Sequence, residues 1–253
     1  MEMPTLFIGQ KLIYLKKTES TNSFAIQLIE NNPEKVMDGM IISAEQQTAG
    51  KGQFNRKWIS NPGENLTFSL ILKPSFLRPE KLFYLNKCIC VSITETINAF
   101  AMNSCIKWPN DIYVSDKKIC GILIENKIKN QQIEFCVAGI GINVNQTVFP
   151  EDITATSLKI ETGKNIPKDS VLQVFCSKFE KNYLKLKQDI KHFDNVYLQK
   201  LKGVNKWQQF RVKNLTASLL IKGVDELGHL ITQDQNGNIQ KWLSGELQWI
   251  NEP

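Results

Sequence analysis

Residues 107–111 read Lys-Trp-Pro-Asn-Asp (KWPND) and end a strand-like run that starts at Cys105. Proline has no backbone N–H to give to a sheet, so the run stops there and delivers an amide and a carboxylate directly after it. Lys107, Asn110 and Asp111 can together surround one polyanionic ligand and its Mg²⁺. An Asn-Asp pair after proline is also a common turn, so the pentapeptide alone leaves both interpretations open.

Three strand-like runs contain or follow this motif and predict a sheet. They are CIKW (105–108), KICGILIEN (118–126) and IEFCVAGIGINVN (133–145). Two of these runs lie close enough in sequence to pair in antiparallel fashion through Ser115-Asp116-Lys117. Gly139 and Gly141 interrupt the last run, and glycines inside a strand indicate a flat ligand lying against bare backbone. An ordinary sheet strand is the alternative interpretation.

The residues before the motif, and those between 168 and 202, combine strand-like and helical patterns. Further strand-like runs are KLIYLKK (11–17), GMIISAEQ (39–46) and NLTFSLIL (65–72). Ser-Thr-Asn at 20–22 offers cap residues for a helix over FAIQLIENN. From Pro79 to Met102 apolar residues recur at three- and four-residue steps, which predicts a long helix that packs one face on a sheet. A second helical region is expected over 168–202, so the fold class is α+β.

The pattern of residue types changes after Lys202. Short strand-like segments alternate with glycines, and DQNGN (234–238) separates HLITQ from IQKWL as a turn. We therefore expect a larger domain over residues 1–202 and a small all-β barrel over residues 203–253. The barrel has a thin core of its own, so it is expected to lean on the larger domain.

A basic loop with two glycines lies between two of the expected strands. Residues 48–58 read TAGKGQFNRKW and show no apolar periodicity. Glycine lets the backbone approach a ligand closely, and Lys51, Arg56 and Lys57 supply the positive charge that attracts a phosphate or a carboxylate. The phosphate-binding fingerprints GxxxxGK[ST] and GxGxxG do not fit this loop. A mobile surface loop is the alternative, although a ring as large as Trp58 usually packs against something.

Composition excludes several classes of protein. With 253 residues, of which 42% are hydrophobic, the chain can bury a sizeable core. No apolar stretch approaches the ~18 residues that span a bilayer, and the first residues lack the pattern of a secretory signal, so we expect a cytoplasmic protein without a membrane partner. Six cysteines without a CxxC pair and only two histidines predict buried thiols instead of zinc ligands. The net charge of +6 mildly favours anionic partners.

Six segments, in order along the chain, resemble the biotin–protein ligases, also called biotin–[acetyl-CoA-carboxylase] ligases. They are STN (20–22), AEQQTAGKGQFNRKW (44–58), KWPND (107–111), KKICGILIE (117–125), GIGIN (139–143) and GELQWI (245–250). The resemblance extends from Tyr14 to Ile250. It implies a mixed central β-sheet flanked by helices, related to class II aminoacyl-tRNA synthetases and lipoyl ligases, with a C-terminal SH3-like barrel. Residues 1–202 would then be the catalytic domain.

The resemblance also implies a two-step reaction. The carboxylate of biotin attacks the α-phosphate of ATP, which carries Mg²⁺, and gives biotinyl-5′-AMP and pyrophosphate. The ε-amine of one lysine on a biotin carboxyl carrier protein then attacks this mixed anhydride and releases AMP. Such chemistry requires two anions to be held together, charge on phosphorus to be neutralised and water to be excluded.

By the same resemblance, residues are assigned to the two substrates. Biotin is expected to contact Ser20, Thr21, Asn22, Gln47, Gly50, Lys51, Gly52, Gln53, Lys118 and Gly121. ATP is expected to contact Gly52, Gln53, Arg56, Trp58, Lys107, Asn110, Asp111, Gly139, Gly141 and Asn143. Lys51, Lys118 and Asp111 are expected to be catalytic: the lysines bring the carboxylate and the phosphate together, and Asp111 faces the phosphates or Mg²⁺.

Some of these assignments make structural claims. Trp58 would cover the adenine, and Asn143 would bond to the nucleotide. Gly121 and Gly139 would leave room for ligand against the sheet. The loops at 46–58 and 110–118 are expected to close over the intermediate and to be candidates for disorder without ligand.

The chain departs from the best-known form of the family's loop, GRGRRGR. Lys51 keeps the first charge and Arg56 the last, but Gln53 stands where an arginine that helps to hold the adenylate is often found. Glutamine can donate hydrogen bonds but carries no charge. We therefore expect an active ligase that releases biotinyl-5′-AMP more readily than relatives with arginine at this position.

Partner expectations follow from the same comparison. Some relatives carry an N-terminal helix-turn-helix domain and repress transcription, whereas here the catalytic pattern begins within the first twenty positions. We expect no specific DNA binding. The family resemblance further implies a monomer or a weak homodimer.

Three alternatives to a biotin ligase remain at this point. A lipoate or octanoate ligase shares the core fold, but KWPND, the tryptophan-bearing loop and the terminal barrel favour biotin. A nucleic-acid-binding module would use the basic loop and the barrel on phosphates, and leaves KWPND and GIGIN unexplained. A biotin-binding protein without catalysis is disfavoured because Lys51 and Lys118 are both present.

Overall fold

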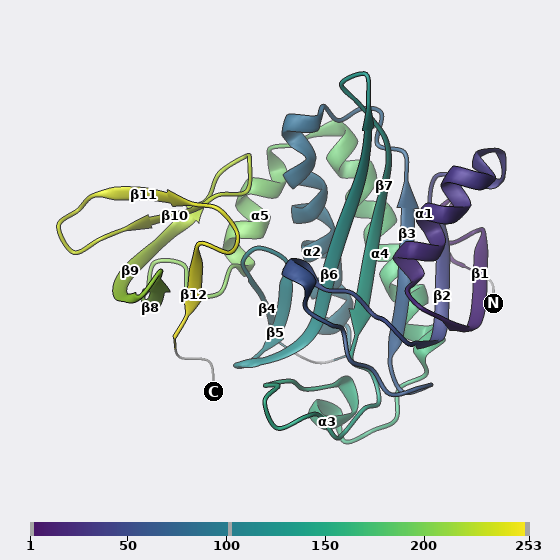
Figure 1. The fold of residues 1–253 in the computed structure, drawn as a ribbon, viewed down its shortest axis with the longest axis horizontal. Helices are drawn as coiled ribbons and strands as arrows, with labels where there is room; N and C mark the ends of the chain where they lie inside the picture. Colours follow the sequence, from purple (N-terminus) through teal and green to yellow (C-terminus); the bar gives the residue numbers. More distant parts are fainter. Residues whose placement is uncertain (1–2, 101–102, 251–253) are drawn as a thin grey trace.

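The computed structural model of this chain describes residues 3–100 and 103–250, apart from the side chain of Asn55. The larger part of the described chain folds around a seven-stranded sheet (Figure 1). Its strands, in the order in which they lie side by side, are β1 (Leu12–Thr18), β2 (Met40–Gln47), β3 (Leu66–Leu72), β7 (Gln132–Ile142), β6 (Lys117–Lys129), β5 (Asp111–Val114) and β4 (Ser104–Lys107). β1 is parallel to β2 and all other neighbours are antiparallel. The expected α+β fold with a mixed central sheet is confirmed.

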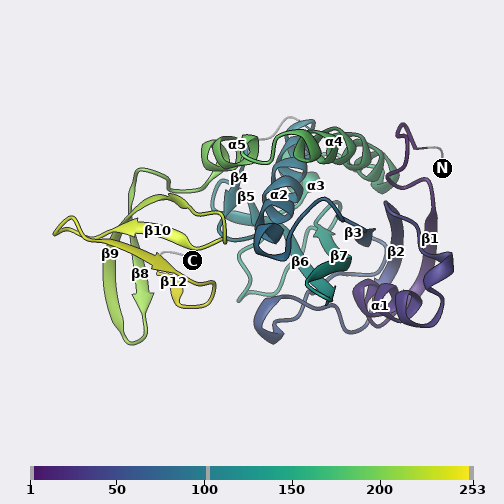
Figure 2. The ribbon, with the colours of Figure 1, turned by 90° about the horizontal axis from the view of Figure 1, so that it is seen from above.

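Helices cover the two faces of this sheet unequally (Figure 2). One face carries α2 (Leu82–Asn98), α4 (Lys168–Gln188) and α5 (His192–Lys200), whereas α1 (Thr21–Asn31) packs on β2, β3 and β7 from the other side. The connections contain α3 (Leu158–Thr162) and the 3₁₀ turns η1 (Pro33–Lys35), η2 (Gln53–Asn55) and η3 (Pro79–Lys81). On this second face, beside α1, the loop of residues 48–58 lies over β6 and β7, where Trp58 approaches Gly121 and Gly141.

The helix expected from Pro79 to Met102 begins as η3 and continues as α2; Met102 lies outside the described residues. The helix packs one face on the sheet, against β4 and β5, as expected, but this is not its only buried face. Almost the whole circumference of α2 is buried, because α4 and α5 cover the side that turns away from the sheet. Polar side chains of α2 such as Lys87 and Ser92 are therefore buried and hydrogen-bonded instead of facing solvent. The second helical region is also divided, into α4 and α5, at residues 189–191.

The segment 110–118 is not a loop, in contrast to the expectation from the sequence. β5 begins at Asp111, the last residue of KWPND, and pairs in antiparallel fashion with both β4 and β6. The turn at Ser115 and Asp116 therefore joins β5 to β6 and does not join CIKW to KICGILIEN. Three residues between the motif and the turn are too few to show a strand period, which explains why the pattern does not reveal β5.

A second sheet, with five antiparallel strands, follows Lys202 (Figure 1). Its strands, side by side, are β11 (Ile239–Trp242), β10 (Leu230–Gln233), β9 (Leu215–Val224), β8 (Trp207–Val212) and β12 (Leu247–Trp249). The turn predicted at 234–238 joins β10 to β11, and the Asp234 carboxylate accepts the backbone N–H groups of Asn236 and Asn238. Phe210 and Ile221 belong to the same apolar cluster as α2 and α4, so the second sheet leans on the first as expected. The domain boundary after residue 202 stays a prediction.

Glu180 of α4 anchors the segment that precedes β1. Its carboxylate is buried and accepts the backbone N–H groups of Leu6, Phe7 and Ile8 at 2.8–3.1 Å. A carboxylate with three backbone donors is well compensated for its burial. The N-terminal segment is thereby fixed to the helix-covered side of the molecule.

Two expectations from composition can be compared with the structure. All six cysteines are unpaired, and all except the half-buried Cys105 are buried. Burial raises the pKa of Cys88 and Cys90, so these thiols remain protonated. Across residues 3–100 and 103–250, no helix has both the length and the apolar character that a membrane span requires.

Candidate functional site

A cavity of about 770 Å³ lies between the less covered face of the central sheet and the edge of the second sheet. Sixteen of the eighteen residues assigned to substrates from the sequence line it, namely Ser20, Thr21, Asn22, Gln47, Lys51, Gly52, Gln53, Arg56, Trp58, Lys107, Asn110, Asp111, Lys118, Gly121, Gly139 and Gly141. The other two, Gly50 and Asn143, do not. Segments that are more than a hundred residues apart in sequence thus meet in one place.

One end of the cavity is formed by the N-terminus of α1 and the end of β2. Ser20 caps the helix, because its hydroxyl accepts the N–H of Ser23. The amide oxygen of Gln47 accepts the backbone N–H of Thr21 at 2.8 Å, which leaves its amide nitrogen to donate to a ligand. Ser69, which the sequence pattern does not single out, lies 2.7 Å from the Thr21 hydroxyl and is fully buried. This end presents short, fixed polar groups.

Asn22 lies flat over the backbone of Gly139. Its amide donates to the Glu125 carboxylate at 2.7 Å, and its oxygen lies 2.6 Å from Ser69 Oγ. A Cβ atom on Gly139 would come within 2.5 Å of the Asn22 oxygen. The bare backbone expected to make room for a ligand therefore accommodates a side chain of the protein, and this side chain forms the cavity wall.

Trp58 covers the paired glycines of β6 and β7. Gly121 and Gly141 lie opposite each other in the sheet, and a Cβ on Gly141 would fall 2.3 Å from the indole. At Gly121 the corresponding distance is 3.1 Å. The indole Nε1 is buried without a hydrogen-bond partner among the described residues. Buried donors are normally paired, so this N–H is a candidate to bind a ligand.

The loop that carries Trp58 is held in a narrow, closed form. The backbone N–H of Gly52 donates to the carbonyl of Arg56 at 2.7 Å. The backbone N–H of Trp58 donates to the carbonyl of Gly50 at 2.9 Å. Gly50 does not line the cavity, but a Cβ there would lie 2.6 Å from the Trp58 carbonyl. Its lack of a side chain thus permits the close approach of the two halves of the loop.

The tip of this loop contacts the second sheet. Phe54 has φ of +54° and packs over Gly245, where a Cβ would lie 3.0 Å from the ring. The side-chain oxygen of Gln53 accepts from the Ser244 hydroxyl at 3.5 Å. The cavity is therefore bordered on this side by residues of GELQWI, whose positions the sequence assigned to no substrate.

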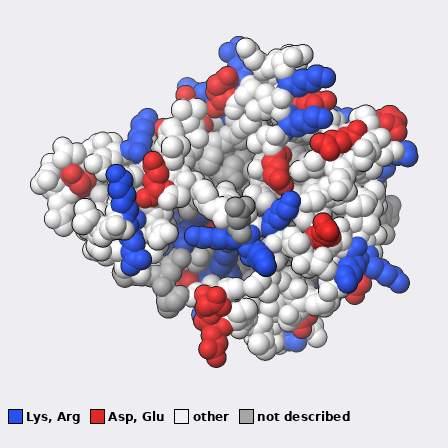
Figure 3. Space-filling model, viewed as in Figure 1, with Lys and Arg blue, Asp and Glu red and all other residues white. Residues whose placement is uncertain are grey.

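The cavity is strongly basic. Its lining contains Lys51, Arg56, Lys57, Lys107 and Lys118, and Asp111 is the one acidic residue among the described residues that line it. Figure 3 shows basic side chains gathered at the centre of this face, between the two sheets. Lys118 and Asp111 form an ion pair at 2.8 Å, so the net charge left at this site favours an anion.

Asn143 lies behind the cavity. It follows the last residue of β7, and its amide donates to the carbonyl of Thr156 at 3.0 Å. Its side-chain oxygen is buried without a partner among the described residues. The assignment of this residue to the nucleotide therefore lacks support from the geometry, because the chain turns it toward the connection before α3.

The described residues contain no group of three or more Cys, His, Asp or Glu side chains that could bind a metal ion by themselves. Mg²⁺ is commonly held by one or two carboxylates together with the phosphates of a substrate. Asp111 alone provides one carboxylate in the basic cavity. The donor set thus fits Mg²⁺ that arrives with a nucleotide and does not fit a metal site built from protein only.

Comparisons with known proteins agree with this arrangement. Residues 14–143 match the model of the biotin/lipoate A/B protein ligase family. The bifunctional ligase/repressor BirA of Bacillus spizizenii is 32% identical, over 97% of this chain and 76% of its own length. The biotin–[acetyl-CoA-carboxylase] ligase of Paracoccus denitrificans is 24% identical, over 88% of this chain and 94% of its own length. The structure resembles the biotin protein ligase from Aquifex aeolicus in complex with biotin and ATP, with a TM-score of 0.79, 31% identity, and coverage of 94% of this chain and 98% of that one.

Proposed function

Because the chain belongs to the biotin/lipoate A/B protein ligase family, we propose that it is an ATP-dependent biotin–protein ligase. It forms biotinyl-5′-AMP from biotin and MgATP and transfers biotin to a lysine of a biotin carboxyl carrier protein. One observation carries the proposal: a fixed polar end, two lysines and a basic loop line the same cavity. Relatives and similar structures are named as biotin ligases, some with biotin and ATP bound.

The polar end at α1 suits the uncharged head of biotin. Ser20, Thr21, Asn22 and Gln47 present hydroxyls and amides that can donate to and accept from a cyclic urea. Because Ser69 and Glu125 already bind two of these side chains, the groups are fixed before a ligand arrives. Fixed polar groups lower the entropic cost of ordering the site.

The basic part of the cavity suits the reacting anions. In the first step a carboxylate oxygen of biotin forms a bond to the α-phosphorus and the bond to pyrophosphate breaks. Lys51 and Lys118 hold the two negative groups together and offset the charge that grows on phosphorus. In the second step the carrier lysine attacks the acyl carbon, loses a proton, and AMP leaves. Trp58 and the loop exclude water from the mixed anhydride.

Arg56, Lys107 and Asn110 are proposed to contact the nucleotide, with Asp111. Lys107 Nζ lies 5.1 Å from the centre of the Tyr113 ring and 5.7 Å from that of Trp249, at the side of the cavity next to the second sheet. Bound Mg²⁺ neutralises phosphate charge, and Asp111 is the residue that would hold it. Biotin is thus assigned to the α1 end and ATP to the end near β4 and β5.

The test is the intact mass of a purified biotin acceptor domain after incubation with this protein, biotin and MgATP. A gain of one biotinyl group that requires all three components, and that is lost when the acceptor lysine is replaced by arginine, is expected. Lipoate and octanoate replace biotin in parallel reactions, because a lipoate-type ligase shares the fold. A mass gain with either acid but not with biotin would contradict the proposal, as would no gain with any of them.

We further propose that the protein has no specific DNA-binding activity and is a monomer or a weak homodimer. Five basic side chains of the described residues line the cavity, where they have a role with phosphates. The edge strand β1 carries Lys16 and Lys17, and lysines on an edge disfavour strand pairing between molecules. Titration of an operator-like duplex and analytical ultracentrifugation test the two statements.

A cytoplasmic location is proposed on the basis of the cysteines. All six are free, and most are buried in the core of the central sheet. Free thiols in this number are typical of a reducing compartment.

A further inference from the structure

The carbonyl oxygen of Pro109, in the middle of KWPND, is held by two buried donors. The side-chain amide of Asn86 on α2 and the hydroxyl of Tyr197 on α5 each donate to it at 2.9 Å. Asn86 is 8% exposed and Tyr197 is 1% exposed, so water does not compete with either donor. The thiol of Cys90 adds a weak contact at 3.9 Å.

These bonds fix the peptide unit that joins Pro109 to Asn110. On one side of it, Trp108 donates its indole N–H to the carbonyl of Gly228 at 2.8 Å. On the other side, the Asn110 amide donates to the carbonyl of Ile122, and the next residue begins β5. Trp108, Pro109 and Asn110 are thus each held by hydrogen bonds to other elements, and side chains of the motif line the cavity.

The two donors themselves do not line the cavity. Tyr197 packs edge-on against Phe83 at 6.0 Å, and burial raises the pKa of its hydroxyl, which therefore stays protonated and able to donate. Asn86 is a polar residue on the apolar face of α2, four residues after Leu82 and three before Ile89. Neither residue could be found from the motif, since both come from helices on the opposite face of the sheet.

We propose that Asn86 and Tyr197 are positioning residues for the nucleotide end of the cavity. By holding the carbonyl of Pro109, they place Asn110 and Asp111 for MgATP. The inference rests on the proposed ligase function. It predicts that loss of either residue changes the KM for MgATP and leaves the KM for biotin unchanged. The biotin end is held separately, by α1 and β2 through the contact of Thr21 with Gln47.

The test measures pyrophosphate release by the full chain with varied MgATP and varied biotin. Tyr197→Phe is expected to raise the KM for MgATP roughly three- to tenfold, which corresponds to one buried hydrogen bond, and to leave the KM for biotin within about twofold. Asn86→Leu is expected to act in the same direction, and the double variant should exceed either single change.

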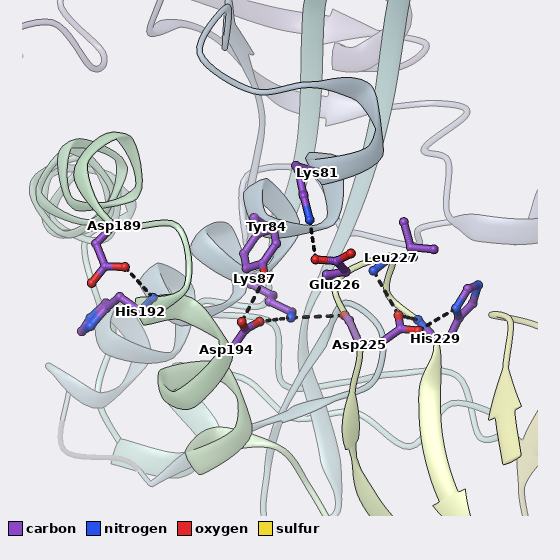
Figure 4. A network of polar contacts seen from close by, with 10 residues as sticks. All are labelled: Lys81, Tyr84, Lys87, Asp189, His192, Asp194, Asp225, Glu226, Leu227 and His229. Carbon is purple, nitrogen blue, oxygen red and sulfur yellow. Dashed lines mark hydrogen bonds and ion pairs between the residues drawn. The ribbon is translucent and has the colours of Figure 1, made fainter. Parts of the chain in front are cut away.

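Tyr84→Phe is the matched control. Tyr84 is also buried at the contact of α2 with α5, and its hydroxyl donates to Asp194 at 2.9 Å without reaching Pro109 (Figure 4). This variant is expected to lower the midpoint of thermal unfolding about as much as Tyr197→Phe does, while both KM values stay at the wild-type level.

Three results separate the possibilities. If the folded Tyr197→Phe and Asn86→Leu variants behave like Tyr84→Phe, or raise the KM for biotin as much as that for MgATP, the positioning role is wrong. If Tyr197→Phe loses its near-ultraviolet circular dichroism and does not fold, Asn86→Leu decides. If the wild-type protein itself releases no pyrophosphate, the ligase function fails first, and the positioning role falls with it.

Discussion

Lys118 and Asp111 form an ion pair whose two members are both proposed to meet MgATP. Their side chains are 29% and 26% exposed, and their charged atoms are 2.8 Å apart. Partly exposed pairs of this kind contribute little to stability. The pair can therefore open to let Lys118 bind a phosphate and Asp111 a cation, at little cost to the fold.

Lys118→Met tests the role of this lysine. The change removes the charge and keeps the length of the side chain, so we expect the rate of biotinyl-5′-AMP formation to fall about 10²–10³-fold, as for loss of one group that stabilises transition-state charge. Lys117→Met is the control, because Lys117 is the adjacent, exposed residue of β6 and lies outside the cavity. Equal rates for the two variants would exclude the proposed role.

Gln53→Arg tests the departure of the loop from the family pattern. Arginine adds charge beside the proposed adenylate, so release of biotinyl-5′-AMP should slow about tenfold in a chase with unlabelled biotin. The change also removes the acceptor for Ser244, and Gln53→Leu, which removes that acceptor without adding charge, is the control. If the Gln53→Arg variant releases biotinyl-5′-AMP as fast as the wild-type protein, the expectation that Gln53 causes faster release is wrong.

Single residues show best where sequence reasoning succeeds and fails. Residues such as Lys51 and Lys118 could be assigned to one site because the family pattern contains them, and both line the cavity; their roles stay a prediction. Ser69 and Glu125 could not, because each acquires its role only through contacts with residues of α1, which are distant in sequence. Asn143 was assigned from the pattern, yet it does not line the cavity, and its amide donates to the carbonyl of Thr156.

At the scale of elements, β6 and β7 supply a flat surface on which Trp58 lies. Gly141→Ala should displace the indole, because the added methyl group would come within 2.3 Å of it. We expect at least tenfold slower adenylate formation with little change in the midpoint of thermal unfolding, since the loop is not part of the core.

Gly121→Ala is the graded control for this change. The added methyl group would lie 3.1 Å from the same ring, a distance that a small shift can relieve, and we expect less than threefold slower catalysis. Equal effects of the two changes would show that the contact with Trp58 does not decide the activity.

Most elements could be predicted, and the exceptions have physical reasons. The strand-like runs that became β1 to β3 and the cap at Ser20 are local signals, and the structure confirms them. β5 is too short to show a period. The pattern in α2 predicts only the face that packs on the sheet, whereas α4 and α5 cover its other side in the fold through tertiary contacts that the local pattern does not show.

For the molecule as a whole, the decisive feature is that both sheets line one cavity. Ser244, Leu247 and Trp249 complete the wall opposite the central sheet. The sequence could predict a small β unit after Lys202, but not which of its turns would face the loop, because that depends on how the two sheets dock. The shared apolar cluster shows that docking is part of the core.

Asp225 lies where the second sheet meets the helices of the first, and it makes the stability of the protein depend on pH. Burial alone would raise the pKa of its carboxyl, but hydrogen bonds from His229 and Lys241 outweigh burial and lower the pKa from 3.8 to about 2. The backbone carbonyl of Asp225 also accepts from Lys87 of α2 at 3.3 Å (Figure 4). The folded state thus binds protons less tightly than the unfolded state, so this contribution is complete above pH ~4 and is lost as the pH falls toward ~2.

Asp225→Asn is therefore expected to lower the free energy of unfolding by about 1–2 kcal/mol at pH 7, with a difference from wild type that shrinks between pH ~4 and ~2. Urea unfolding at a series of pH values measures it. Asp234→Asn, in the exposed turn between β10 and β11, is the control and should have a smaller effect at pH 7. A difference for Asp225→Asn that is independent of pH would contradict the argument.

The two ends of the described chain lie in unlike surroundings, which matters for anyone who attaches something to this protein. The segment before β1 is bound by Glu180 on α4, on the helix-covered side (Figure 2). At the other end, Trp249 still lines the cavity and Ile250 donates to Gln209 of β8. A purification tag, a fluorophore or a surface linker placed after residue 250 would begin beside the opening that a carrier domain has to reach. Attachment at the N-terminal end leaves that approach clear.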